Sequence, residues 1–128
     1  MKLLLDTCAL IWFFAGSDRI NHRLRSLLTD PGNDLRMSDV SVLELVIKHK
    51  LGKLGWEQSP SRLLPVLARK HRLNSEPLTA QAIYYLEVLP LLHRDPFDRL
   101  LIAQAVTSNC LLVTPDPLIR SYSVKTIW

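Results

Sequence analysis

The pattern of hydrophobic and polar positions divides the chain into short strand-like segments and longer segments of helical spacing. The short segments are residues 2–5, 35–37, 73–76 and 111–114, and a last strand is expected to include Val124. The first and fourth of these are almost entirely apolar, which is typical of strands covered on both faces. The sequence therefore predicts four to five buried strands.

The helical segments carry apolar residues three and four positions apart and have recognisable ends. Gly16 follows the first of them, and Ser38 or Asp39 caps the third. Asp95 at the cap and Pro96 at the first helical position make a strong start signal. The predicted helical segments are residues 8–15, 20–28, 39–51, 63–68, 80–89 (closed by Pro90) and 96–108.

Strands that alternate with helices predict parallel βαβ units. We therefore expect a single α/β domain over residues 1–128, with three layers (α/β/α) and a short, mostly parallel sheet of four to five strands. In open sheets of this kind, ligands bind outside the carboxyl ends of the strands. This rule selects the residues to inspect for function.

Composition narrows the class of protein. The chain has 128 residues, of which 48% are apolar and 22% charged, as in globular domains. No window approaches the roughly 18 uninterrupted apolar residues of a membrane span. Asp6 splits the apolar N-terminus and argues against a signal peptide. Cys8 and Cys110 show no disulfide framework and are expected to be buried thiols, so we expect a cytoplasmic protein.

The charge of the chain changes the expected partners. Its formal net charge is +4 and its pI is near 9.3. This excess suits an anionic partner such as nucleic acid, or an acidic protein that covers the same surface. A basic surface without a dedicated partner fits the charge equally well.

Two aspartates follow predicted strands. Asp6 directly follows the first strand and Asp116 lies two residues after the fourth, so a parallel sheet places both at its carboxyl edge. A turn or helix-cap role is the structural alternative, and it is stronger for Asp116, which stands between Pro115 and Pro117. Asp6 interrupts an apolar run, where a carboxylate usually has a partner or a cation.

Glu44 lies in the middle of the third predicted helix, at the boundary of its apolar face. Val40, Ile47 and Leu51 flank it on one side. A plain surface ion pair with Lys48, four residues later, explains it as well, at about a few tenths of a kcal/mol. Both interpretations remain open from spacing alone.

Asp98 occupies the centre of an apolar helix face. The positions closest to it around the helix are Leu101, Ile102 and Ala105. At the third helical position it also completes a capping box with Asp95 and favours the helix dipole. That role does not explain its apolar surroundings, because a buried carboxylate is costly without a positive partner.

Three or four carboxylates at one sheet edge repel one another unless a cation lies between them. An all-oxygen set selects Mg²⁺ or Mn²⁺ over zinc. Acidic centres of this kind act mainly on phosphate groups, so a basic protein with such a pocket suggests phosphodiester hydrolysis. The histidines lack zinc spacing and are expected on the surface: His22, His49, His71 and His93.

These segments resemble the PIN domain, and in particular the VapC-like toxins of bacterial toxin–antitoxin pairs. The specific segment is Asp95-Pro96-Phe97-Asp98-Arg99, within a block that runs from His93 to Ala105. The resemblance covers essentially the whole chain in the same order. The other segments that carry it are Leu4-Leu5-Asp6-Thr7, residues 38–54 with Ser41, Glu44 and Lys48, and Val113-Thr114 with Asp116.

The resemblance implies an Mg²⁺-dependent endoribonuclease, with Mn²⁺ as the alternative ion. By this similarity Asp6 and Asp98 are direct metal ligands, and Asp116 is a fourth, more variable catalytic acid. Glu44 ligates a second ion or orients the attacking water, and Lys48 contacts a phosphate oxygen. The resemblance also implies an RNA substrate, a homodimer, and a cognate antitoxin whose tail blocks the site.

The sequence departs from the family pattern at three positions. Relatives often carry His in place of Cys8, an aromatic residue in place of Leu43, and Phe soon after Asp116, where this chain has Pro117-Leu118-Ile119. A haloacid-dehalogenase-like phosphatase is a poor alternative, because its second Asp would stand where Cys8 does. The alternative from another class is a catalytically silent PIN-like module that binds RNA or protein.

Overall fold

The computed structural model describes residues 1–128 and contains a sheet of five strands in which all neighbours are parallel. The spatial order of the strands is β3-β2-β1-β4-β5, with β1 in the centre. The predicted α/β fold with a parallel sheet is therefore confirmed. The strands are β1 (Lys2–Leu5), β2 (Asp34–Ser38), β3 (Leu73–Glu76), β4 (Leu111–Val113) and β5 (Thr126–Ile127).

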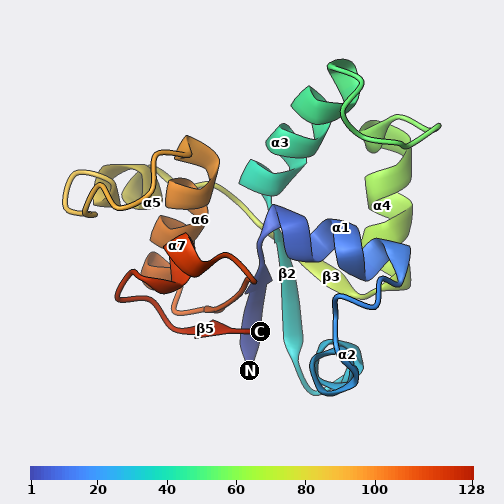
Figure 1. Ribbon diagram of the computed structural model, residues 1–128, viewed down its shortest axis with the longest axis horizontal. Coiled ribbons are helices and arrows are strands. Elements are labelled where there is room, and N and C mark those ends of the chain that lie inside the picture. The colour runs from blue at the N-terminus through green and yellow to red at the C-terminus, as the bar shows by residue number, and fades with distance from the viewer.

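Seven helices surround this sheet. In Figure 1, α5, α6 and α7 lie on one side of the strands and α1, α2 and α4 on the other, while α3 extends beyond the carboxyl end of β2. No helix has the length and apolar character needed to cross a membrane. The helices are α1 (Thr7–Ala15), α2 (His22–Thr29), α3 (Asp39–Lys50), α4 (Pro60–Lys70), α5 (Ala80–Tyr85), α6 (Pro96–Thr107) and α7 (Pro117–Arg120).

The central strand explains the two separate cores. Leu3 and Leu5 belong to the core shared with α1 and α2, whereas Leu4 belongs to the core shared with α6 and α7. All three side chains are fully buried, because successive residues of a strand face opposite sides of the sheet. Burial on both faces is the reason why β1 is a continuous apolar run.

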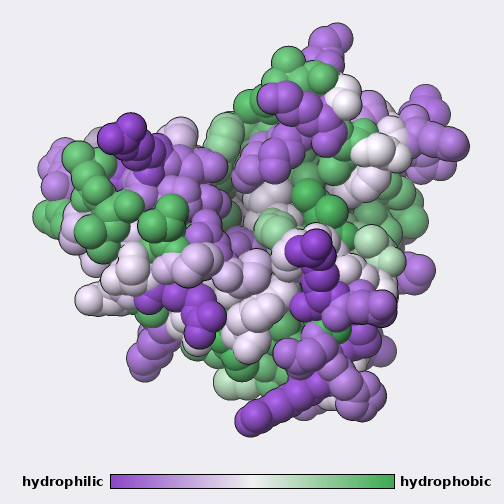
Figure 2. Space-filling view, viewed as in Figure 1, coloured by the Kyte–Doolittle hydropathy of each residue, from purple (hydrophilic) through white to green (hydrophobic).

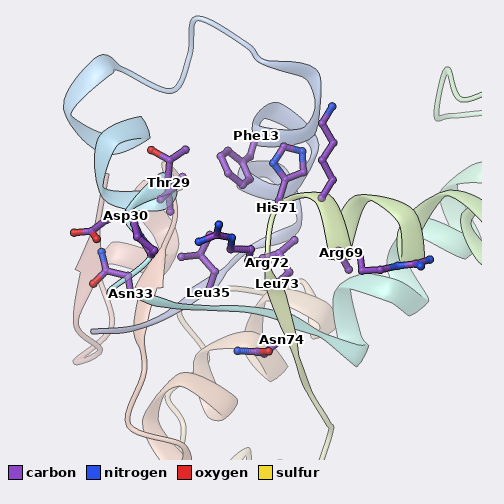
Figure 3. A pocket seen from close by; sticks show the side chains of 14 residues that line it. Phe13, Thr29, Asp30, Asn33, Leu35, Arg69, His71, Arg72, Leu73 and Asn74 are labelled. Atoms are coloured by element: carbon purple, nitrogen blue, oxygen red, sulfur yellow. The ribbon is translucent and has the colours of Figure 1, made fainter.

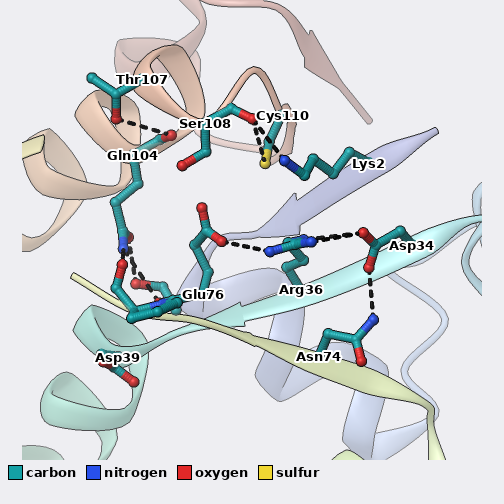
Figure 4. A network of polar contacts seen from close by, with 12 residues as sticks. Lys2, Asp34, Arg36, Asp39, Asn74, Glu76, Gln104, Thr107, Ser108 and Cys110 are labelled. Carbon is teal, nitrogen blue, oxygen red and sulfur yellow. Dashed lines mark hydrogen bonds and ion pairs between the residues drawn. The ribbon is translucent and has the colours of Figure 1, made fainter. Parts of the chain in front are cut away.

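A buried glutamine ties α6 to the carboxyl ends of β2 and β3. The side-chain Oε1 of Gln104 accepts a hydrogen bond from Ser38 Oγ, and its Nε2 donates to the carbonyls of Glu76 and Pro77 at 3.4 and 3.3 Å (Figure 4). Ser38 Oγ also accepts the Val40 amide at 2.9 Å and so caps α3. This network joins the start of α3 to α6, the two helices that carry Glu44 and Asp98.

The helix predicted over residues 80–89 is shorter in the structure, and α5 ends at Tyr85. The next three backbone amides donate to carbonyls three residues earlier, at 3.0 to 3.1 Å, so the chain continues in tight turns. Leu89 thereby turns into the core with 8% exposure, while Leu91 remains 83% exposed. The apolar spacing alone did not distinguish these turns from helix.

Two features near the C-terminus also differ from expectation. The last strand is Thr126–Ile127, and Val124 precedes it and packs against the α6 core instead. The short helix α7 was not predicted, although Asp116-Pro117 repeats the start signal of α6. Cys110 is buried as expected, whereas Cys8 is half-buried, and both are free thiols.

Candidate metal centre

Asp6 and Asp116 lie together at the carboxyl edge of the sheet, and each also caps a helix. The Asp6 amide donates to the Val113 carbonyl at 3.0 Å, which joins the ends of β1 and β4. Asp6 Oδ1 accepts the Ala9 amide at 2.7 Å at the start of α1, and Asp116 Oδ1 accepts the Leu118 amide at 2.8 Å at the start of α7. Each of these aspartates therefore caps a helix and also lies at the carboxyl edge of the sheet.

Asp98 turns its carboxylate toward a histidine and another acid. Its Oδ2 lies 3.0 Å from His93 Nε2, and the same nitrogen lies 3.1 Å from Asp116 Oδ2. The predicted capping box is wrong, because the Asp95 amide donates to His93 Nδ1 at 3.2 Å and not to Asp98. Asp95 does cap α6, accepting the Phe97 and Asp98 amides.

His93 corrects the expectation that all four histidines lie on the surface. Its side chain is 11% exposed and bridges Asp98 and Asp116. Sequence reasoning missed this contact because His93 stands in a loop, where no periodic pattern indicates which way a side chain points. The available signal was its position two residues before the Asp95 cap of α6.

Glu44 is buried, with 8% exposure, and only one of its two carboxylate oxygens has a partner. Its Oε2 forms an ion pair with Lys48 Nζ at 3.1 Å, while the Lys48 side chain is 40% exposed. Its Oε1 is buried without any hydrogen-bond partner. The predicted i,i+4 pair exists, but it does not lie on a solvated face. An unpartnered carboxylate oxygen is costly, so a further positive group fits beside it.

Burial and mutual repulsion shift the pKa values of the acids upward. Burial is the main cause that raises the pKa of Asp6 to about 6; hydrogen bonds from the Thr114 side chain and the Ala9 amide oppose the rise, and the charges of Asp116 and Glu44 add to it. Burial, followed by the charge of Asp95, raises the pKa of Asp98 to about 7, and His93 opposes this rise. Asp6 and Glu44 also contribute to the shift at Asp98. The structure thus brings the four acids into one electrostatic cluster.

Three hydroxyl side chains that carry the family resemblance, but to which the sequence analysis gave no role, support this cluster. Thr114 Oγ1 accepts the Asp116 amide at 3.1 Å and its side chain bonds Asp6. Thr7 Oγ1 donates to Ser41 Oγ at 2.9 Å, which joins the first turn of α1 to α3. Apart from that resemblance, their sequence signal is that each stands close to one of the acids.

The donor set of the cluster fits a hard divalent cation. Carboxylates reach it from the ends of β1 and β4 and from α3 and α6, and the candidate ligand atoms of His93, Asp98 and Asp116 lie within 4.8 Å of one another. Oxygen donors dominate, which favours Mg²⁺ or Mn²⁺. The buried, unpartnered Glu44 Oε1 is the structural sign that positive charge fits here.

A separate cavity contains none of the predicted site residues. This cavity of about 630 Å³ is lined by residues that precede β2 and β3, including Asp30 and Asn33, together with the basic end of α4 (Figure 3). His71 lies there against the ring of Phe13, at 4.7 Å between centroids. The cavity lies at the amino edge of the sheet, away from the acids.

The strand order, the parallel direction and the acidic carboxyl edge define a class of three-layer α/β/α domains with a candidate metal centre at the strand ends. The model of the PIN domain family matches residues 3–125, so the chain belongs to the PIN domain family. This confirms the resemblance found from the sequence.

Solved structures agree with this assignment. The chain is similar to a chain in the crystal structure of VapBC2 from Rickettsia felis, which is bound to a DNA fragment from the VapBC2 promoter. The two chains share 18% identity with a TM-score of 0.76, and the match covers 99% of this chain and 98% of that one. It is also similar to DNA-bound VapBC from Salmonella typhimurium, with 18% identity, a TM-score of 0.69, and coverage of 99% and 97%. At these identities the likeness concerns the fold. No curated protein is significantly similar to the chain in sequence.

Proposed function

We propose that the protein is a metal-dependent endoribonuclease that acts as the toxin of a toxin–antitoxin pair. The observation that carries this proposal is the set of acids at the carboxyl edge, where Glu44 Oε1 is buried without a partner and burial raises the pKa of Asp6 and Asp98. Acids in such a state favour a bound cation over isolated charges. Membership of the PIN domain family supports the nuclease assignment.

Asp6 and Asp98 would hold Mg²⁺, or Mn²⁺ in its place. When bound, the ion would polarise a phosphate oxygen and lower the pKa of the attacking water. Glu44 would ligate a second ion or orient that water, because Lys48 pairs with its Oε2 and leaves its Oε1 without a partner. Asp116 would complete the catalytic set as its fourth acid.

RNA is the proposed substrate, because the chain is basic while its site is acidic. The net charge of +4 favours a polyanion, and the acids leave the remaining surface more basic still. Lys48 lies at the boundary between Glu44 and solvent, with its side chain 40% exposed. We assign it a contact with a phosphate oxygen of the bound strand.

Two exposed apolar patches support two protein partners, a second copy of the chain and a cognate antitoxin. Figure 2 shows hydrophobic surface on both sides of a hollow between the part formed by α5 to α7 and the part formed by α3 and α4. Exposed apolar patches of this kind mark interaction sites. The first patch, on α3 and the residue after it, contains Leu43, Val46, Ile47 and Leu51. The second patch, on α5 and the loop after it, contains Ile83, Tyr84, Val88, Leu91 and Leu92.

The test is cleavage of RNA by the purified, partner-free protein, with Mg²⁺ or with chelator. We expect discrete cleavage with Mg²⁺ alone, and a loss of at least about a hundredfold in Asp6→Asn and Asp98→Asn. Asp18→Asn is the matched control, because Asp18 is exposed and lies outside the cluster. Single-stranded and duplex DNA of the same sequence measure the preference for RNA.

Equal cleavage by wild type and both site variants would identify a contaminating nuclease and remove the support for the site. Binding of RNA without cleavage, unchanged in Asp6→Asn, would instead favour the catalytically silent binding module. Preferential cleavage of DNA would retain the metal centre and reject the proposed substrate.

A further inference from the structure

The loop that carries His93 is held firmly from the side of α7. Tyr122 is 6% exposed, and its hydroxyl oxygen accepts the Leu92 and His93 amides at 2.9 and 2.8 Å. The same hydroxyl donates to the Pro90 carbonyl at 2.7 Å. The backbone of His93 is therefore fixed independently of any contact made by its ring.

The contacts of the His93 ring determine which nitrogen carries the proton. The Asp95 amide donates to Nδ1 at 3.2 Å, so Nδ1 acts as the acceptor of a neutral imidazole. The ring proton then lies on Nε2, which faces the Oδ2 atoms of Asp98 and Asp116 at 3.0 and 3.1 Å. Both carboxylates share one N–H donor.

This arrangement differs from that of a histidine metal ligand. A ligating Nε2 must be unprotonated, which places the ring proton on Nδ1. In this chain Nδ1 already faces the Asp95 N–H, and two N–H groups directed at each other would leave both without an acceptor. Histidine ligands normally direct the second N–H at a carboxylate, carbonyl or water, the reverse of what is seen here.

We infer that His93 is a positioning residue of the proposed metal centre: its Nε2–H holds the carboxylates of Asp98 and Asp116 together, and its ring does not ligate the ion. The inference rests on the proposed function, because it assigns a role within that site. His93 and the Leu118 amide together engage both oxygens of Asp116, whereas His93 engages only Oδ2 of Asp98. Asp98 is therefore the better-placed ligand, and Asp116 supports it.

The preference among metals follows from the same geometry. With the imidazole used as a donor, the available ligands are carboxylate oxygens, and such a set favours Mg²⁺ and Mn²⁺ over Zn²⁺. A histidine that ligated through Nε2 would shift this preference toward Zn²⁺ or Co²⁺. The two roles of His93 thus predict opposite effects of its removal on metal selectivity.

The experiment measures Mn²⁺ affinity by electron paramagnetic resonance in the purified, partner-free chain. His93→Ala removes the donor and is expected to weaken Mn²⁺ binding about 10- to 100-fold. His93→Gln keeps an N–H donor of similar reach and is expected to stay within about threefold of wild type. His22→Ala is the control, because His22 is exposed on α2. Unfolding curves in chelator verify that each variant is folded.

A second measurement reads the ring directly. Long-range ¹H–¹⁵N NMR distinguishes the two nitrogens, and we expect a proton on Nε2 of His93 both without and with Mg²⁺. This signal would not follow from a role in folding alone. Cleavage by His93→Ala is expected to recover at high Mn²⁺ concentration, because the residue acts through the ligands and not on the substrate.

Equal Mn²⁺ affinity in wild type and His93→Ala would overturn the inference. So would a His93→Gln variant as weak as His93→Ala with a larger loss of Co²⁺ than of Mn²⁺ affinity, since that pattern identifies a ligand. A proton on Nδ1 in the NMR spectrum would overturn it as well. A wild type that binds Mn²⁺ through His93-dependent ligands but cuts no RNA would reject the nuclease and leave this inference standing.

Discussion

Two groups of acids on the same parallel sheet differ in how their negative charge is balanced. Across β2 and β3, Arg36 donates to Asp34 at 2.9 Å and to Glu76 at 2.8 Å, and Asn74 donates to Asp34 at 2.7 Å (Figure 4). At the carboxyl edge, the four acids have Lys48 as their one ion-paired lysine, together with a single N–H donor from His93.

The pKa values reflect this difference. Hydrogen bonds from Asn74 and Arg36 hold the pKa of Asp34 below its ordinary value, whereas burial raises the pKa of Asp6 to about 6 and of Asp98 to about 7. The first group is satisfied by the protein itself. The protein supplies the second group with less positive charge than it carries negative charge. The balance of charge, and not the number of acids, therefore distinguishes a candidate site from a structural network.

The largest expected effect on stability comes from removing Arg36, which balances the charges of Asp34 and Glu76. Arg36→Met removes the partner of Glu76, which is 5% exposed, and leaves its charge buried. We expect a loss of about 3 kcal/mol in the free energy of unfolding, measured by urea denaturation. Mn²⁺ affinity should stay at the wild-type level. A parallel loss of Mn²⁺ affinity would show that the two acid groups are not independent.

The next effect concerns Asp6 at the carboxyl edge, where a substitution is expected to raise the free energy of unfolding instead of lowering it. The folded pKa of Asp6 lies above the ordinary 3.8, so the metal-free folded state loses stability as the pH rises from about 4 through about 6. At pH 8 we expect Asp6→Asn, in chelator, to be more stable than wild type by up to about 3 kcal/mol. Asn still caps α1, because it also accepts the Ala9 amide.

The difference between this variant and wild type should shrink toward zero near pH 4, where wild-type Asp6 is protonated in the fold. Urea denaturation at the two pH values measures it. Added Mg²⁺ should stabilise wild type at pH 8 and leave Asp6→Asn nearly unchanged. A less stable Asp6→Asn at pH 8 would mean that a protein group already balances Asp6, which would remove the contrast with Asp34.

The smallest effect tests the one lysine of the acidic cluster. Lys48→Ala should lower the free energy of unfolding by about 1 kcal/mol, because it removes the one ion pair of the buried Glu44 carboxylate, although the lysine itself is 40% exposed. In RNA binding, it should reduce the slope of log affinity against log salt by about 0.7, the value for one phosphate contact on a single strand. Lys70→Ala, in the amino-edge cavity of Figure 3, is the control and should leave the slope unchanged.

Most of the fold followed from local signals. The cap Asp95 with Pro96 placed the start of α6, and Gly16 placed the end of α1, because caps act within a few residues along the chain. The same logic failed beyond Tyr85, where apolar spacing continued but the hydrogen bonds tightened into turns. The choice between helix and turn there follows from how Leu89 reaches the core, which is a tertiary requirement.

The residues of the candidate site also divide into those that local signals predicted and those that only tertiary contacts identify. Asp6 and Asp98 stood out because each interrupts an apolar pattern, and a charge within such a pattern is a signal that can be read locally. His93 and Thr114 interrupt no pattern, and their nearness to Asp95 and Asp116 in the sequence did not indicate which acids they contact. Lys48 was found from its i,i+4 spacing to Glu44.

The sequence by itself determined the parallel α/β fold, the ends of most elements and the acids that reach the carboxyl edge, because periodicity, caps and strand ends depend on neighbouring residues. Only the tertiary structure decided which acids are balanced by the protein and which are not. Arg36 meets Glu76 across 40 positions of the chain, and His93 meets Asp116 across 23. Electrostatic balance depends on such distances in space, and these exist only after the sheet has brought the elements together.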